Sequence, residues 1–412
     1  MNDTSNSNSN FNLTIFQTIE IDCHIISFLD PVWDLSNLAL TNRYYAELVK
    51  SNDRYNKIKL FYVKKHKLKL SYYWPRAMDC VTEMFLKACV FGYIDAAKYI
   101  YDNYDVDIHF DEEILFRWTC QNGHLEVAKW LLKTSLKTDK IINFHAKEEH
   151  AFKWSCQHGF FDLSKWLLGY AIKLKSPIDL HLDEERIFRG ACLGGDLRIV
   201  KWLIEYTDSI NSPIDIHAQE EHCFRSCFDK GYFEMAKWLL DLSRKRGQII
   251  NINEMNEYAL RQGCHGGYLE MVKWLIELST ELNMPININI YQDEAFRLAC
   301  NKGHLSVCKW LIGLGVQLNR PIDIHAHEEE AFRISCEKNY FEQGQYLYQL
   351  AEDLGQSIDI YSCNNYAFIV ACGEENWEIA KWLCRLSHGK YYVKGKKVLR
   401  WGIKRNSCCT IS

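Results

Sequence analysis

One segment decides the fold, and its residue pattern recurs along the chain: Ala299-Cys300-Asn301-Lys302-Gly303-His304-Leu305-Ser306-Val307-Cys308-Lys309-Trp310-Leu311-Ile312. A large apolar residue, usually Phe, stands four positions before the cysteine in every copy but the fifth, which has Phe228 in place of the cysteine. These anchors recur every 36 residues, after a shorter first step, at Phe85, Phe116, Phe152, Phe188, Phe224, Leu260, Phe296, Phe332 and Phe368. A constant period of this size predicts a stack of about nine structural repeats.

Each repeat is predicted to form two helices. In residues 295–300 the apolar positions recur at spacings of three and four, which marks one face of a helix. Gly303 is expected to end that helix in a left-handed conformation. The second helix is expected to start near Leu305 and to bury Leu305, Val307, Trp310 and Leu311. The connecting stretch 321–326 then leads into the next repeat.

The quoted segment resembles the ankyrin-repeat core, and the resemblance covers residues 82–387. Two features differ from that family, whose repeats are about 33 residues long and open their first helix with Thr-Pro-Leu-His. Here the period is 36 and Ala-Phe-Arg stands at that opening. The Ile-Asp-Ile-His-Ala connections most resemble the ankyrin families of giant DNA viruses. The resemblance implies an all-α, ankyrin-type helical-repeat solenoid that binds target proteins without catalysis.

Cysteine and histidine, two common metal ligands, each form a column along the repeats, but their spacing suits neither a metal site nor a catalytic site. Cysteines 36 residues apart on packed helices cannot converge on one zinc ion, so we expect small buried thiols. The histidines of the connecting stretches are expected to be structural for the same reason: His109, His145, His181, His217 and His325. No phosphate loop or nucleophile elbow is present. The sequence therefore predicts no enzyme, no cofactor and no bound metal.

A pair of acids precedes the first helix in five repeats, at 112–113, 148–149, 184–185, 220–221 and 328–329. One interpretation is favourable charge at a helix N-terminus. The other is an acidic stripe that receives a basic partner, and the sequence leaves both open. The tryptophan of each Lys-Trp pair is expected to be mostly core, and only an exposed one would count as a binding residue.

Residues 13–60 do not follow the repeat and are separated from it by a connecting segment, 61–81. Two amphipathic helices are predicted there, with Asp34 capping the second. The segment resembles an F-box, although Gln17-Thr18 stands where that family has Leu-Pro. The resemblance implies docking to the Skp-type adaptor of a cullin–RING ubiquitin ligase through Ile25, Ile26, Leu29 and Leu35. The alternative is a helical cap on the repeat stack.

The last segment, residues 388–412, is a basic tail with seven Lys or Arg and no acid. It ends in Cys409-Thr410-Ile411-Ser412, which fits a prenylation signal at Cys409, with Cys408 available for a second acyl group. A lipid and a basic patch together would attach the chain to a membrane surface. Two alternatives stay open, an unmodified tail and a contact with single-stranded nucleic acid.

Composition sets the remaining expectations. The net charge of −4 gives no general attraction to nucleic acid, and the 17 cysteines without an export signal suit a reducing compartment. Residues 1–12 are predicted to be a disordered leader. We expect a host-cytoplasmic protein, membrane-associated if the tail is lipidated, neither secreted nor membrane-spanning. Two functions remain: a substrate-recruiting ligase subunit, or a binding module that sequesters its target without ubiquitin chemistry.

Overall fold

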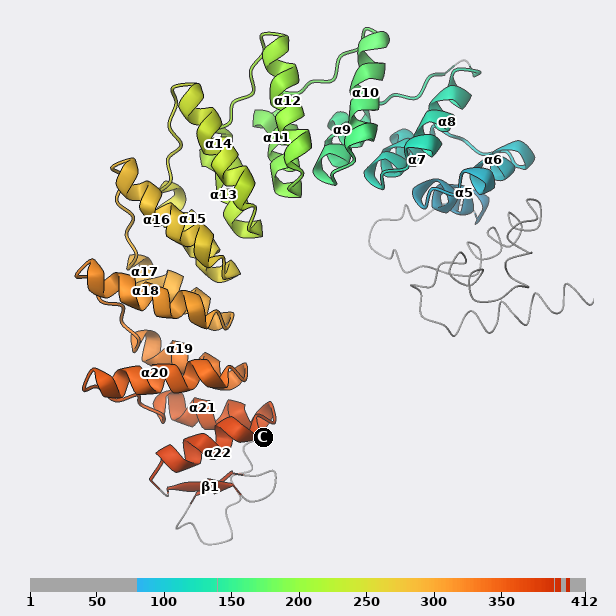
Figure 1. Cartoon of the computed structure of the whole chain (residues 1–412). Helices are drawn as coiled ribbons and strands as arrows, with labels where there is room; N and C mark the ends of the chain where they lie inside the picture. The colour runs from blue at the N-terminus through green and yellow to red at the C-terminus, as the bar shows by residue number, and fades with distance from the viewer. Residues whose placement is uncertain (1–79, 139, 389, 394–397, 401–412) are drawn as a thin grey trace, which may run out of the picture. The chain divides into compact units, whose positions relative to one another are not determined.

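The computed structural model describes residues 80–138, 140–388, 390–393 and 398–400. This part of the chain contains eighteen helices and one pair of strands (Figure 1). It divides into two compact units, with the boundary after Leu182. The predicted leader, the F-box-like segment and the end of the basic tail lie outside the described residues. Among the described helices, none is both long and apolar enough to cross a lipid bilayer.

The first unit contains three helical pairs. Its helices are α5 (Cys80–Val90), α6 (Ile94–Asn103), α7 (Phe110–Gln121), α8 (Leu125–Ser135), α9 (Ala146–Gln157) and α10 (Phe161–Lys173). The first helix of each pair packs on the first helix of the next, α5 on α7 and α7 on α9. The second helix packs on the first within each pair. Each pair therefore completes its core with its neighbours, as a solenoid requires.

The second unit contains six helical pairs stacked in the same way (Figure 1). The first helices are α11 (Leu182–Gly194), α13 (Ala218–Lys230), α15 (Glu254–Gly266), α17 (Ile290–Asn301), α19 (Ala326–Glu337) and α21 (Ser362–Gly373). The second helices are α12 (Leu197–Ser209), α14 (Phe233–Lys245), α16 (Leu269–Glu281), α18 (Leu305–Gln317), α20 (Phe341–Asp353) and α22 (Trp377–Leu386). The predicted all-α, ankyrin-type helical-repeat solenoid is confirmed.

The anchor column forms the core. All nine anchor side chains are at most 1% exposed. The tryptophans lie between repeats, since the ring of Trp274 is 6.3 Å from that of Phe224 in the preceding repeat. On α18 the structure buries Val307 and Leu311 as expected, but leaves Leu305 and Trp310 half-buried. The bulky indole therefore only partly enters the interface, as is common for tryptophan.

The turn between the two helices depends on a left-handed residue. Gly231 has φ +74°, and a Cβ atom placed on it would lie 2.7 Å from Cε1 of Tyr268 in the next repeat. The glycine thus allows both the backbone conformation and the close approach of the neighbouring ring. Where the column departs from glycine, Asn339 and Glu375 adopt positive φ values of 60° and 58°.

The start of the predicted basic tail covers the last repeat. Strands β1 (Tyr391–Val393) and β2 (Val398–Arg400) pair antiparallel, which the sequence analysis did not anticipate. The ring of Tyr391 lies 4.7 Å from that of Phe368 on α21. Its hydroxyl donates to Asn365 Oδ1 at 3.2 Å. Tyr391 thereby covers apolar surface that a following repeat would otherwise bury.

Three glycine-to-alanine variants separate the cost of the left-handed backbone from the cost of the close side-chain contact at Gly231. Gly231→Ala meets both the positive φ and the Tyr268 contact, so we expect a loss of about 2 kcal/mol or more in unfolding free energy. Gly247→Ala has φ +71° but open space around its Cβ, and should lose about 1 kcal/mol. Gly313→Ala lies within α18 in open space and should gain about 0.5–1 kcal/mol. Urea unfolding followed by circular dichroism measures the series, and equal losses would refute this account.

Candidate functional site

The first helices of all repeats but the first begin with a left-handed turn. In α13 the three residues Gln219, Glu220 and Glu221 have φ between 55° and 59°. The same three-residue turn starts at Asp111, Lys147, Asp183, Gln219, Met255, Tyr291, His327 and Cys363. Left-handed backbone costs about 1–2 kcal/mol per residue for side chains other than glycine. Such a turn persists only where its surroundings hold it in place.

An arginine holds this turn from inside the same repeat. Nε of Arg225 donates to the carbonyl oxygen of Glu220 at 2.6 Å, and Nη2 donates to that of Gln219 at 3.0 Å. The same two bonds are made by Arg117, Arg189, Arg261, Arg297 and Arg333. This explains the Ala-Phe-Arg that replaces the ankyrin Thr-Pro-Leu-His. The last repeat has Ile369 at this position, and its turn contains Asn364 and Asn365, which tolerate left-handed backbone better.

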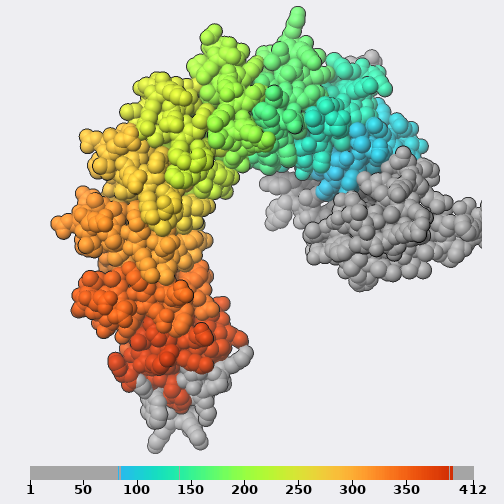
Figure 2. All heavy atoms as spheres, viewed as in Figure 1, coloured from blue at the N-terminus to red at the C-terminus, as the bar shows by residue number. Residues whose placement is uncertain are grey.

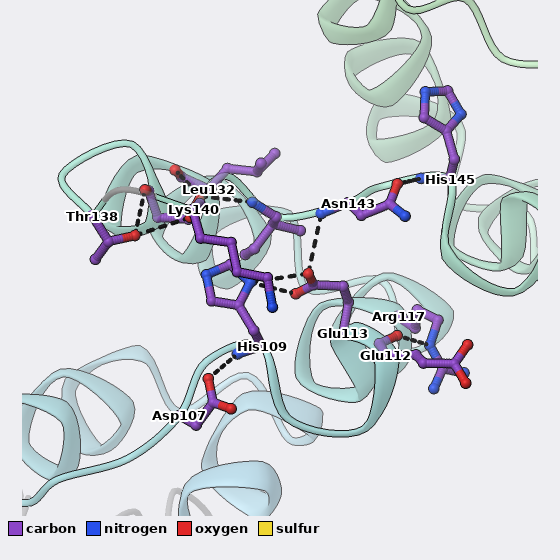
Figure 3. A network of polar contacts seen from close by, with 12 residues as sticks. Asp107, His109, Glu112, Glu113, Arg117, Leu132, Thr138, Lys140, Asn143 and His145 are labelled. Carbon is purple, nitrogen blue, oxygen red and sulfur yellow. Dashed lines mark hydrogen bonds and ion pairs between the residues drawn. The ribbon is translucent and has the colours of Figure 1, made fainter.

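A buried carboxylate joins each turn to the next repeat. Oε1 of Glu221 accepts the backbone N–H of Asn251 at 3.0 Å, thirty residues along the chain, and its carboxylate also meets Nδ1 of His217 at 2.9 Å. Equivalent N···O distances of 2.9–3.4 Å join six more pairs: Glu113–Asn143, Glu149–Asp179, Glu185–Asp215, Glu257–Asn287, Asp293–Asp323 and Glu329–Asp359. We call these seven bonds the inter-repeat ties. Figure 3 shows the tie at Glu113.

The ties divide the predicted acid column into two roles. The second acid of each pair is buried, 3% exposed at Glu113 and 6% at Glu221, and binds the next connecting segment. The first acid, such as Glu112 or Glu220, is exposed. The sequence analysis considered helix-end charge and an acidic stripe, and it missed the tie. The signal was present in the constant separation of thirty residues between the acid and the Asp or Asn of the next Ile-Asp-Ile-His segment.

The histidine column supports the ties. The carboxylate of Asp215 accepts the backbone N–H of His217, which fixes the start of the helix. The His217 imidazole then meets Glu221, and His109, His145 and His325 make the same contact with their own acids. Burial lowers the pKa of His325, but its hydrogen bond and charge contact with Glu329 outweigh burial, so the pKa is raised overall. These contacts fit the structural role expected of the histidines.

The cysteine and tryptophan columns differ in how deeply they are buried. The cysteine column is buried except for half-buried Cys372. Burial raises the pKa of Cys156 to about 12, so its thiol is neutral and unreactive at physiological pH. All seven tryptophans of the Lys-Trp pairs are half-buried. Within the described residues, no cluster of His, Cys, Asp and Glu could hold a metal ion. The adaptor and lipidation candidates, Ile25, Ile26, Leu29, Leu35, Cys408 and Cys409, lie outside the described residues.

An open hollow of about 450 Å³ lies where one turn of the first unit meets the next connecting segment (Figure 3). Its lining includes His109, Glu113, Lys140, Asn143 and His145. Acids, lysines and imidazoles gather there, and the lining supplies no hydroxyl or thiol nucleophile. The lining therefore offers charged and polar groups for contacts with a ligand.

The first residue of the turn changes from repeat to repeat, and in the second unit it is exposed in all but half-buried Cys363. In the second unit we define the turn row as the first residue of each turn: Asp183, Gln219, Met255, Tyr291, His327 and Cys363. Met255 and Tyr291 are 43% and 53% exposed. Neighbouring turns touch, because Gln219 Nε2 donates to Glu184 and Cys363 Sγ lies 2.9 Å from Glu328 Oε2. The row thus presents varied side chains on a constant framework.

The family comparison agrees with the repeat architecture. Residues 224–322 match the family model of ankyrin repeats, in three copies. No curated protein matches the sequence. The solved structures that align with it include two of the pentatricopeptide repeat protein PPR10 in complex with an 18-nt psaJ RNA element, one of them with three cysteines replaced. Each shows 10% identity and a TM-score of 0.28, over 82% of this chain and 48% of that one. This chain therefore spans about half the length of that protein. The ankyrin repeats indicate a protein–protein interaction module.

The inter-repeat tie predicts that substitution of one acid lowers the stability of the fold and that substitution of its neighbour hardly changes it. Glu221→Ala leaves the N–H of Asn251 without its acceptor, so we expect a loss of about 1–2 kcal/mol in unfolding free energy. Glu220→Ala removes an exposed side chain and should change it by less than about 0.5 kcal/mol. Urea unfolding measures both. An equal effect of the two variants would show that the tie contributes nothing.

His150, on α9, gives a pH prediction. Burial and the charges of Arg117 and Lys153 lower its pKa from 6.5 to about 4. The unfolded chain then binds more protons than the folded chain between these pH values, so stability falls as the pH drops through this window. His150→Gln should remove about 1 kcal/mol of the loss between pH 7 and pH 5, allowing for partial solvent screening. Thermal unfolding at both pH values tests this, and an unchanged pH dependence would contradict it.

Proposed function

We propose that this chain is a non-catalytic scaffold that holds a target protein on its repeats and delivers it to a cullin–RING ubiquitin ligase. The turn row supports the first part of this proposal, the binding of a target protein on the repeats. Fold-determining positions repeat from unit to unit, whereas the row changes from Asp to Gln, Met, Tyr, His and Cys. Positions that are exposed, adjacent and free to vary are those that can be shaped to one partner.

The chemistry of the turn row suggests the kind of segment it receives. Met255 and Tyr291 offer exposed apolar surface, and the guanidinium of Arg261 lies 5.5 Å from the Tyr291 ring centroid. The exposed acids Glu184, Glu220 and Glu328 lie on the turns to either side. A target segment with an apolar side chain flanked by basic residues would match this order, because aromatic residues dominate binding energy and charges set orientation.

The ligase role rests on residues 13–60, which resemble an F-box. In this proposal Ile25, Ile26, Leu29 and Leu35 contact a Skp-type adaptor. The chain would act by proximity alone, bringing lysines of the target near a charged ubiquitin enzyme. The resemblance of the repeats to those of giant DNA viruses suggests a viral protein that acts on host proteins in the host cytoplasm. The basic tail, if lipidated at Cys409, would keep it at a membrane.

The alternative is an ankyrin-repeat module that sequesters its target without a ubiquitin role. It keeps the turn row as the binding surface and makes residues 13–60 a helical cap. Gln17-Thr18, in place of the F-box Leu-Pro, favours this alternative. The two functions differ in one respect, which is whether the adaptor and the target are bound by the same chain.

Two variants separate the functions in one experiment. The full chain is expressed in eukaryotic cells, precipitated, and its partners are quantified by mass spectrometry. Ile26→Asp with Leu29→Asp should abolish recovery of the Skp adaptor and a cullin but keep the target. Met255→Asp with Tyr291→Asp should lose the target and keep the adaptor. Val316→Asp, at a 69% exposed site on α18, is the matched control and should lose neither.

Three other outcomes are informative. Recovery of a target that depends on the turn row, with no adaptor in any sample, would support the sequestering module and refute the ligase role. Adaptor recovery that is equal in all variants would place that contact outside residues 13–60. An unchanged partner set after the turn-row substitutions, in a folded variant, would show that the row is not the target surface.

A further inference from the structure

The outer ends of two second helices in the first unit carry lysines and aliphatic side chains together. Residues 136–137 and 140–141 follow α8, and residues 172–175 are Ile, Lys, Leu and Lys at the end of α10. The ends of α8 and α10 lie at the same edge of this unit (Figure 1). We call these eight residues the lysine–aliphatic edge. It is separate from the turn row, which lies at the start of the first helices.

The aliphatic members of this edge are unusually exposed. Leu136 and Ile172 are 52% and 50% exposed, Ile141 is 49% and Leu174 is 39%. Several large aliphatic side chains with half their surface in water, close in space, mark an interaction site more often than chance exposure. In Figure 2 this part of the first unit reaches outward from the helices.

The charge of the edge has one sign among its described residues. Lys137, Lys140, Lys173 and Lys175 are all exposed, and in the described part of the chain none of their side chains forms an ion pair. Lys140 lines the hollow with Glu112 and Glu113, which leaves Lys137, Lys173 and Lys175 at the edge itself. The one acid in these two sequence segments is Asp139, which lies outside the described residues. Three ammonium groups beside exposed aliphatic side chains therefore give the described part of the edge a cationic and apolar surface.

The repeat fold does not require this chemistry. The positions that correspond to Leu136-Lys137 and Ile172-Lys173 are Asp208-Ser209, Arg244-Lys245, Thr280-Glu281, Val316-Gln317 and Glu352-Asp353 in the second unit. Exposed aliphatic residues therefore recur with the repeat, as Val316 and Ile249 show at the positions of Leu136 and Ile141. The edge differs in its charges: among the described residues Lys137, Lys173 and Lys175 form no ion pair, whereas Arg244 and Arg246 pair with Glu281 and Asp208.

We propose that the lysine–aliphatic edge docks this unit on an anionic lipid surface. Lysines gain from the negative potential of anionic headgroups, and aliphatic side chains between them enter the interface between headgroups and acyl chains. An edge that projects from the helix ends suits a flat bilayer better than it suits a protein ligand, which binds most tightly in pockets. The contact would orient the repeats on a membrane independently of any lipid on the tail and of the adaptor.

Vesicle sedimentation of the full, unlipidated chain tests this proposal. Vesicles of phosphatidylcholine with about one third phosphatidylserine should bind the chain, and pure phosphatidylcholine should bind it weakly. The triple variant Lys137→Gln, Lys173→Gln and Lys175→Gln should lower the partition coefficient about 100-fold, at roughly fivefold per lysine. Leu136→Ser with Ile172→Ser should lower it about tenfold or more. Circular dichroism confirms that each variant is folded.

Two controls assign the effect to the edge. Lys98→Gln, Lys230→Gln and Lys302→Gln remove the same charge from exposed sites elsewhere and should change partitioning by less than about threefold. Lys394→Gln, Lys396→Gln and Lys397→Gln report on the tail. The proposal is overturned if the edge variants bind like the unaltered chain, if only the tail variant loses binding, or if no anionic vesicle binds. Capture of an acidic amphipathic peptide through the edge, without vesicle binding, would assign it to a protein partner instead.

Discussion

A single hydrogen bond, from the backbone N–H of one connecting segment to a buried carboxylate of the preceding repeat, underlies this architecture. Repeats in a solenoid contact only their neighbours, so each interface must set the geometry of the next. The tie at Glu221 does this beside apolar packing, because Asn251 stands between the buried side chains of Ile250 and Ile252. The acceptor is a carboxylate that the imidazole of His217 also contacts, so the bond has a defined direction.

The tie also explains why the chain tolerates a strained turn. The acid of each tie is the third left-handed residue of its turn, and in six of the eight turns an arginine bonds the carbonyl oxygens at the start, as Arg225 does. The strain is thus restrained at both ends of such a turn, and the first side chain of the turn takes no part in the tie. Ankyrin proteins of the usual period open this helix differently. The longer repeat here replaces that opening with a turn that presents one variable side chain, and this is what makes the turn row available for a target.

Much of the fold could be predicted from the sequence, because it depends on periodic apolar columns. Phe296, Cys300 and Gly303 indicated the helix pair and its turn, and Val307 and Leu311 were placed correctly in the core. The left-handed turn could not be read from its residues, since Gln219-Glu220-Glu221 is an ordinary helix-forming sequence. It results from tertiary bonds to Arg225 and Asn251 that override local propensity. Burial of one acid of a pair and exposure of the other likewise depend on a partner thirty residues away.

Native-state hydrogen exchange of the connecting segments tests the tie most directly. The amide of Asn251 should exchange slowly, with protection close to that of the neighbouring helices, because its N–H is bonded to Glu221. The amide of Ile249, two residues earlier, has no acceptor among the described residues and should exchange quickly. Slow exchange is likewise expected for the amides of Asn287 and Asp323, which bind Glu257 and Asp293. Exchange of Asn251 as fast as that of Ile249 would contradict the account, since the repeats would then be joined by apolar packing alone.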